Sequence, residues 1–185
     1  MKEDLLAKLT AKDDRYACAF ADRILLESQE TSKWYACLDD FSALLNHPKS
    51  LVRNRALHIL AANVQWDADN RFDAILPDVL AHVTDEKPIT ARQCVKALAR
   101  IGLARPRYIP SILSRLRQAD LSCYRDSMRP LIEKDIAETE RILTDAGPVS
   151  SSVSISASHR TGESCGQAAL SGGGPALPLD PGKYR

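Results

Sequence analysis

Glycine is almost absent from residues 1–146, where Gly102 is the only one of the chain's eight glycines. Loops that cradle phosphate need glycine, because a side chain would block the close approach of the backbone to the ligand. These 146 residues also contain no G-x-S-x-G turn that would present a nucleophilic serine. These absences argue against nucleotide hydrolysis and nucleophilic catalysis. We therefore expect a protein that is not an enzyme, with no catalytic residue and no cofactor.

Closely spaced metal ligands and long apolar runs are absent as well. The five cysteines and four histidines form no C-x-x-C or H-x-x-x-H pair of the kind that holds zinc, so we expect no metal site. No apolar run approaches the length that crosses a bilayer. The first five residues carry acidic side chains where a signal peptide carries basic ones. The expected localisation is cytoplasmic, with no membrane partner.

Two stretches of the chain have the apolar spacing of paired helices. In residues 34–66, Pro48 interrupts the pattern because proline cannot continue a helix, and Ser50 is placed to cap the second helix. Residues 72–102 repeat this plan, with Gly102 where a C-terminal cap belongs. The residues expected to face the core are Trp34, Leu38, Phe41, Leu44, Leu45, Val52, Ala56, Ile59, Leu60, Val64, Phe72, Ile75, Leu76, Val79, Leu80, Val83, Ile89, Ala91, Cys94, Val95, Leu98 and Ile101. Each stretch is therefore predicted to be one pair of helices.

The two predicted pairs also repeat at a regular interval. Arg53 and Arg92 lie at matching points near the start of each second helix, at an interval of 92 − 53 = 39 in the sequence. A period of about 40 residues that contains two helices is typical of HEAT and armadillo arrays. One pair cannot bury its own apolar face, so neighbouring pairs must stack. The predicted fold is all-α, a HEAT/armadillo-like solenoid of helical repeats.

A short motif supports this fold. The pattern Pro-x-x-x-Val-Arg-x-x-Ala, read at Pro48, Val52, Arg53 and Ala56, resembles the HEAT-repeat signature. More closely, residues 9–136 resemble a family of short bacterial HEAT-repeat proteins. The segments that carry the resemblance are Lys12-Asp13-Asp14-Arg15-Tyr16, Leu38-Asp39-Asp40-Phe41, Val52-Arg53-Asn54-Arg55, Asp85-Glu86-Lys87-Pro88 and Asp126-Ser127-Met128-Arg129-Pro130-Leu131. The resemblance implies the same solenoid fold and no catalytic residues. Some family members carry names tied to iron–sulfur cluster assembly, which implies an accessory role there as one alternative.

The N-terminal part is predicted to cap the array. Residues 2–9 are expected to form a short helix. The spacing of Thr10 and Asp13 resembles a capping box, with Asp in place of the usual Glu. The helix that follows is expected to pack Tyr16 into the core. A third helix pair is expected after residue 106.

The C-terminal part divides into an ordered and a disordered segment. Pro130 suits the first turn of the last helix, which is expected to bury Leu131 and to end near Thr144. The helical repeat domain is therefore predicted to cover residues 1–145. Residues 146–185 hold seven of the eight glycines, a serine-rich run and no Phe or Trp, so they are predicted to be a disordered tail.

Positive charge is concentrated in one part of the chain. Residues 86–130 carry 10 basic and 3 acidic side chains, although the whole chain has a net charge of +1. Arg92, Lys96 and Arg100 follow one another at intervals of four, which places them on one face of a helix. The second helix of each HEAT pair lines the concave side of the array. The candidate partner-binding residues are Arg53, Arg92, Lys96, Arg100, Arg107 and Arg115.

The same charges have a second interpretation as ordinary surface. A solvated helix face that balances acidic neighbours would carry a similar stripe. Arg53 in particular could pair with an acid of a neighbouring repeat, since the arginine of the HEAT signature often does. The acids available for this pairing are Asp39, Asp40, Asp78 and Asp85.

The leading functional hypothesis is a non-catalytic protein-binding or scaffolding module that uses the concave face of the array. Its partner would be an unidentified protein, and an acidic one would complement the basic residues; the oligomeric state is left open. The alternative is binding of a nucleic-acid backbone through the basic face of residues 86–130. A third comparison is with DNA glycosylases built from helix pairs, because Trp34 and the dipeptide Trp66-Asp67 provide their residue types. The two tryptophans are also explained as hydrophobic plugs at helix ends.

Overall fold

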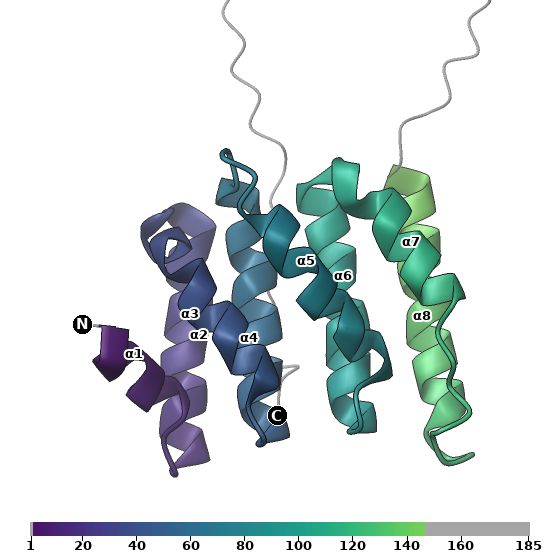
Figure 1. Ribbon diagram of the computed structural model, residues 1–185, viewed down its shortest axis with the longest axis horizontal. Helices are drawn as coiled ribbons and strands as arrows, with labels where there is room; N and C mark the ends of the chain where they lie inside the picture. The colour runs from purple at the N-terminus through teal and green to yellow at the C-terminus, as the bar shows by residue number, and fades with distance from the viewer. Residues whose placement is uncertain (1, 147–185) are drawn as a thin grey trace, which may run out of the picture. The chain divides into compact units, whose positions relative to one another are not determined.

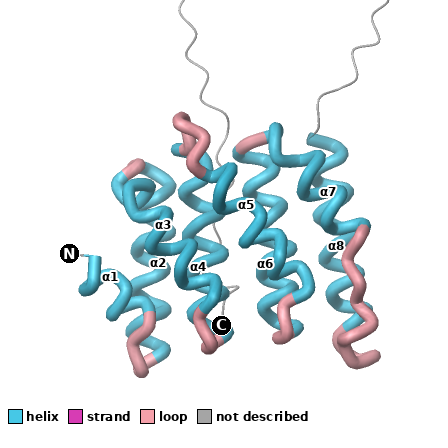
Figure 2. Tube along the Cα trace, viewed as in Figure 1, coloured by secondary structure: helices cyan, strands magenta, loops and turns pink. Residues whose placement is uncertain are grey.

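The computed structural model describes residues 2–146, and within that range every regular element is a helix and no strand occurs (Figure 2). The all-α prediction is confirmed. The α-helices are α1 (Lys2–Leu9), α2 (Asp14–Glu30), α3 (Leu38–Ala43), α4 (Ser50–Asn63), α5 (Phe72–Ala81), α6 (Pro88–Ala104), α7 (Ile109–Arg117) and α8 (Arg129–Ala146). Short 3-10 helices occur at Lys33–Cys37, Leu44–Asn46, Val64–Trp66, His82–Thr84 and Pro106–Tyr108. The predicted tail lies outside the described residues apart from Ala146, which ends α8.

The α-helices form two rows (Figure 1). The longer helices α2, α4, α6 and α8 stand side by side, and each packs against the next. They are parallel, because the chain enters each of them at the same edge of the row, the lower edge in Figure 1. The shorter helices α3, α5 and α7 run the opposite way along one side of this row. None of the described helices combines the length and the apolar character needed to cross a membrane.

Helix α4 is enclosed, with a long helix on each side. Ten of its fourteen residues are buried, and Leu57, Ile59 and Leu60 have no exposed surface. A surface helix buries a single stripe, whereas α4 is buried on most of its circumference, polar side chains included. The core therefore runs through α4 and continues into α6 through residues such as Leu98 and Ile101, which are also fully buried.

The structure gives a repeat interval that differs by one position from the one read off the sequence. Helices α4 and α6 begin at Ser50 and Pro88, an interval of 88 − 50 = 38. The turns that precede them match at the same interval: Lys49 N donates to His47 Nδ1 (3.1 Å), and Lys87 N donates to Asp85 Oδ1 (2.8 Å). In both turns a side chain closes the loop just before the long helix. The interval of 38 therefore reflects equivalent backbone positions.

Arg53 and Arg92 are consequently not equivalent, contrary to the sequence interpretation. At an interval of 38, Arg53 corresponds to Ala91, and both are buried. Arg92 corresponds to Asn54, and both are half-buried. A shift of one residue turns a side chain by about 100° around a helix axis, which is enough to move it from the core to the rim. The two arginines therefore have different surroundings.

Two predicted helix starts are also corrected. The side chain that caps α2 belongs to Asp13, whose Oδ1 accepts hydrogen bonds from the backbone N–H groups of Arg15 (2.9 Å) and Tyr16 (3.2 Å). Thr10 instead donates its hydroxyl hydrogen to the carbonyl of Leu6, four residues back. At α4, Ser50 is the first helical residue and no side chain caps the helix. Short polar residues were correctly placed near the helix starts, but at the wrong cap positions.

Gly102 lies inside α6, which continues to Ala104, so it is not the predicted C-terminal cap. A Cβ atom at this position would lie 2.5 Å from Cδ2 of Leu143 in α8. Real Cβ atoms essentially never approach another atom so closely. The glycine therefore permits the close packing of α6 against α8.

Three large residues that were predicted to face the core are exposed. They are Ile89 (60% exposed), Tyr16 (49%) and Leu131 (40%). Each lies in the first turn of a long helix, at the edge of the row of long helices where these helices begin. For Ile89 the helical spacing itself argues against burial, because the fully buried Leu98 lies nine residues later, on the opposite side of α6.

Candidate functional site

The first candidate residue, Arg53, lies inside the protein. It is 5% exposed, and its guanidinium donates from Nε to Asp85 Oδ2 (2.9 Å) and from Nη2 to Oδ1 (2.8 Å). These hydrogen bonds to Asp85 raise the pKa of Arg53 further, although burial opposes this. Nη1 also donates to the carbonyls of His47 and Pro48. The alternative interpretation, that Arg53 pairs with an acid of the neighbouring helix pair, is confirmed for Asp85.

Asp85 joins three segments of the chain. Burial alone would raise its pKa, but Arg53, Lys87 N and the His82 ring together hold that pKa below its usual value. His82 Nδ1 lies 2.7 Å from Asp85 Oδ2. Tyr124, from the loop after α7, donates its hydroxyl to the backbone carbonyl of Asp85 (2.5 Å). Asp85 and Arg53 thus form a structural ion pair that links α4, the turn before α6 and the α7–α8 loop.

Arg92 and Arg107 also pair with acids of neighbouring helices. Arg92 Nε donates to Asp135 Oδ2 of α8 (2.5 Å), and this hydrogen bond raises the pKa of the arginine. Arg107 is exposed, and it bonds to the carboxylate of Asp73 in α5 and to the hydroxyl of Tyr108. Both arginines connect one helix pair to the next.

Arg115 and an arginine that the sequence analysis did not select, Arg105, bind backbone groups. Arg115 donates to the carbonyl of Leu80 (3.2 Å) and to the hydroxyl of Thr84 (2.8 Å), at the end of the preceding short helix. Arg105 donates to the carbonyl of Val64 (3.1 Å) and to that of the next residue (2.9 Å). These carbonyls belong to helix ends, where intrahelical partners are missing. Both side chains therefore stabilise the stacking of successive pairs.

Lys96 and Arg100 remain on the outward side of α6, beside His58 of α4. Lys96 is exposed and Arg100 is half-buried. His58 is 6% exposed, and its Nε2 lies 3.0 Å from Oε1 of Gln93. Burial and then the positive charge of Arg100, with a smaller effect of Lys96, lower the pKa of His58 to about 4. This imidazole is therefore neutral at physiological pH, and the positive charge of this surface comes from α6.

Helices α4 and α6 contain no aspartate and no glutamate. The flanking long helices α2 and α8 each contain several. The arginines at the start of α4 and α6 obtain their acidic partners from other elements: Arg55, for example, donates to the Asp14 carboxylate (2.8 Å) and to the carbonyl of Leu9 (2.9 Å). The outward side of α4 and α6, named here the acid-free face, is therefore a surface whose own charges are all positive.

The exposed residues of the first turns form a second feature of this side. Leu51, Ile89 and Leu131 lie in the first turns of α4, α6 and α8, and Leu51 is 44% exposed. They are three of the five large hydrophobic residues that are exposed in the described part of the chain. Tyr16 also lies in a first turn, but Glu27, eleven residues later on the same stripe of α2, bonds to Trp34 before α3, so Tyr16 is not on this side. Because the long helices begin at one edge (Figure 1), we name Leu51, Ile89 and Leu131 the apolar row. No single-helix pattern identifies the row, since it appears only when the helices are aligned.

The apolar row and the positive charges share one stripe of α6. Lys96 follows Ile89 by seven residues, which is about 20° short of two full helical turns. Arg100 follows Ile89 by eleven residues, about 20° beyond three turns. The three side chains therefore project on the same side of the helix. The stripe offers an apolar contact at its first turn and positive charge further along.

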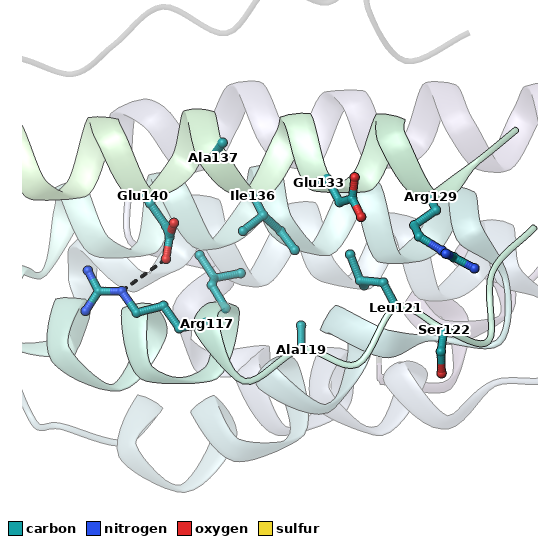
Figure 3. Close-up of a pocket in the computed structure, with 10 residues that line it drawn as sticks. Arg117, Ala119, Leu121, Ser122, Arg129, Glu133, Ile136, Ala137 and Glu140 are labelled. Atoms are coloured by element: carbon teal, nitrogen blue, oxygen red, sulfur yellow. Dashed lines mark hydrogen bonds and ion pairs between the residues drawn. The ribbon is translucent and has the colours of Figure 1, made fainter. Parts of the chain in front are cut away.

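A groove of about 540 Å³ lies between α7 and α8, at the last helix pair (Figure 3). Its apolar residues include Leu116, Leu121 and Ile136. At one end Arg117 Nε donates to Glu140 Oε1 (3.2 Å), the contact drawn as a dashed line. The lining contains no histidine, cysteine or aspartate. It offers a bound molecule apolar contact and a balance of positive and negative side chains.

The residues of the glycosylase comparison take part in internal contacts. Asp67 is 2% exposed; its Oδ1 accepts from the hydroxyl of Tyr35 (2.7 Å) and from Phe72 N (3.2 Å), and its Oδ2 accepts from the hydroxyl of Tyr108 (3.1 Å). Trp66 is part-buried and donates its indole N–H to the carbonyl of Ser28. Asp67 therefore connects the starts of successive helix pairs, and its geometry gives the comparison no support.

Between residues 2 and 146, no three His, Cys, Asp or Glu side chains come together in a way that could hold a metal ion. The expected absence of a metal site stays a prediction. No protein-family model matches the chain, and neither a curated protein nor a solved structure matches it. The resemblance to short bacterial HEAT-repeat proteins thus stays a prediction from the sequence.

Proposed function

We propose that this protein is a non-catalytic binding module of the HEAT type, and that its acid-free face binds an acidic segment of a partner protein. The stacked helix pairs and their interval of 38 support the HEAT assignment. The observation that carries the function is the absence of any acid in α4 and α6, with Lys96 exposed on that face and Arg100 half-buried beside it. A cytoplasmic location belongs to the same proposal.

The internal use of the arginines favours a protein partner over nucleic acid. Among the six candidate residues, Arg53, Arg92, Arg107 and Arg115 are hydrogen-bonded to neighbouring helices. Proteins that bind duplex backbones with strong salt dependence make roughly 6–10 phosphate contacts. The acid-free face does not present that many basic side chains. The iron–sulfur alternative rests on the family resemblance, and no contact described above favours it.

The test is a capture experiment with the full chain on a resin and bacterial lysate, run in parallel with and without nuclease treatment. Lys96→Glu reverses the exposed charge of the acid-free face, and Lys134→Glu makes the same change on α8 as a matched control, since both lysines are exposed. We expect the wild type and Lys134→Glu to retain an acidic protein that Lys96→Glu does not retain. Moderate salt should elute it, because exposed charges are screened.

Two results would contradict the proposal. Equal capture by all three proteins would mean that the acid-free face takes no part in binding. Capture that disappears on nuclease treatment would instead support the nucleic-acid alternative.

A further inference from the structure

We propose that the apolar row and Lys96 together receive an acidic amphipathic helix of the partner. This helix would cross the first turns of the long helices and place a large apolar side chain on the row at every seventh residue. The inference rests on the proposed function and specifies the shape and chemistry of the partner segment.

The regular position of the row is the first support. Leu51 and Ile89 are the second residues of α4 and α6, and they are 44% and 60% exposed. Leu131 lies in the first turn of α8. Single exposed hydrophobic residues are ordinary on a protein surface, whereas contiguous ones mark contact sites. Here one large residue recurs in each of three adjacent parallel helices.

The spacing of the row fits a helix. Packed helices lie about 8–10 Å apart, so the first turns of adjacent long helices are separated by about that distance. A helix rises about 1.5 Å per residue, and seven residues therefore span about 10.5 Å. A partner helix that crosses α4, α6 and α8 would bring positions i, i+7 and i+14 to successive members of the row.

The backbone of the partner also favours a helix over an extended segment. An extended segment needs hydrogen-bonding partners for its own N–H and C=O groups, and a sheet edge normally provides them. Residues 2–146 contain no strand that could do so. A helix satisfies its backbone groups internally, so it can lie on apolar side chains without leaving polar groups unpaired.

The charges around the apolar row determine which charge the partner helix should carry. Asp14 is shared by Lys49 (2.7 Å) and Arg55 (2.8 Å), so two positive charges face one negative charge beside Leu51. Lys96 adds a further positive charge on the stripe of Ile89. The row also lies at the N-terminal ends of three parallel helices, where the helix dipoles favour negative groups. Aspartate and glutamate between the apolar positions would complement this edge.

The experiment uses a phage-displayed library of random peptides of about 18 residues, long enough for three anchors seven residues apart. The peptides are selected on the full chain, and enriched peptides are then titrated against variants. Ile89→Asp removes a member of the row. Leu26→Asp is the matched control, because Leu26 is the fifth exposed large hydrophobic residue (56% exposed) and lies in the second half of α2. Thermal melting by circular dichroism checks that each variant is folded.

We expect acidic peptides with an apolar residue at every seventh position. Their affinity should fall about tenfold or more in Ile89→Asp, the equivalent of about 1.4 kcal/mol, and should stay within about twofold in Leu26→Asp. Peptides with alternating apolar residues, basic peptides, no enrichment, or equal binding to Ile89→Asp would overturn the inference.

Lys96→Glu separates this inference from the proposed function. If the enriched peptides lose affinity in Lys96→Glu but not in Ile89→Asp, the acid-free face binds acidic segments and the helix on the row is wrong. If neither variant changes the affinity, both proposals fail.

Discussion

Two regions of this protein use basic side chains in opposite ways. Between successive helix pairs, arginines are enclosed by carboxylates and carbonyls, as Arg53 is by Asp85 and by the carbonyls of His47 and Pro48. On the acid-free face, Lys96 is exposed and makes no ion pair with the residues that the structure describes. Helix α6 contributes to both regions. Arg92 bonds to Asp135 of α8, whereas Lys96, four residues later, faces outward.

The comparison separates stability from binding. A buried charge that loses its partner is strongly unfavourable, whereas an exposed charge contributes little to folding. Basic residues between the pairs should therefore determine whether the array folds, and those on the acid-free face should determine what it binds. Substitutions that affect stability in one region and not in the other test this division.

The largest effect is expected at the buried pair. Asp85→Ala leaves Arg53 buried without its carboxylate and also removes the acceptor for Lys87 N. We expect a loss of about 3–5 kcal/mol in the free energy of unfolding, measured by urea denaturation. Asp126→Ala is the control, because that carboxylate is 99% exposed. A loss at Asp85 no larger than at Asp126 would show that the region between the pairs does not depend on its ion pairs.

A smaller effect, which depends on pH, is expected from His58. Its pKa is about 4 in the folded protein, below the ordinary value of 6.5. The unfolded chain therefore binds the proton more readily, so stability is complete above pH 6.5 and is lost as pH falls toward 4. The free energy of unfolding should decrease by about 2 kcal/mol between pH 7 and pH 5 from this group alone.

The comparison for His58 is the variant His58→Asn, which cannot be protonated. We expect its stability to change less than that of the wild type over the same pH range, because the lowered-pKa carboxylates, such as Asp14, Asp73 and Asp85, stay ionised at pH 5. Equal slopes for the two proteins would mean that His58 is not held neutral by burial and by the positive charges of α6.

Much of the fold follows from local sequence signals. Helix periodicity and the proline-containing breaks predicted the helix pairs on both sides of Pro48 and Pro88, and Pro130 correctly marked the first turn of α8. Caps were less predictable, because neighbouring short polar residues such as Thr10 and Asp13 compete for the same backbone N–H groups. Gly102 was assigned to a cap because its contact with Leu143 of α8 is not visible within one helix.

The candidate site required alignment between helices. An error of one position in the repeat interval made Arg53 and Arg92 look equivalent, although one is enclosed by Asp85 and the other by Asp135. The apolar row escaped detection for a different reason. Within α6, Ile89 was assigned to the core because it is apolar, although it shares a stripe with Lys96 and lies opposite the buried Leu98.

The smallest difference is expected between two residues of α6 that lie one turn apart. Arg92 and Asp135 form a half-buried pair, and Arg92→Ala should lower the free energy of unfolding by about 1 kcal/mol. Lys96→Ala should leave it within about 0.5 kcal/mol, because that side chain is exposed. Urea denaturation of the two variants under identical conditions measures both values. If Lys96→Ala proved as destabilising as Arg92→Ala, the acid-free face would contribute to folding as the region between the pairs does, and its positive charge would no longer argue for a partner.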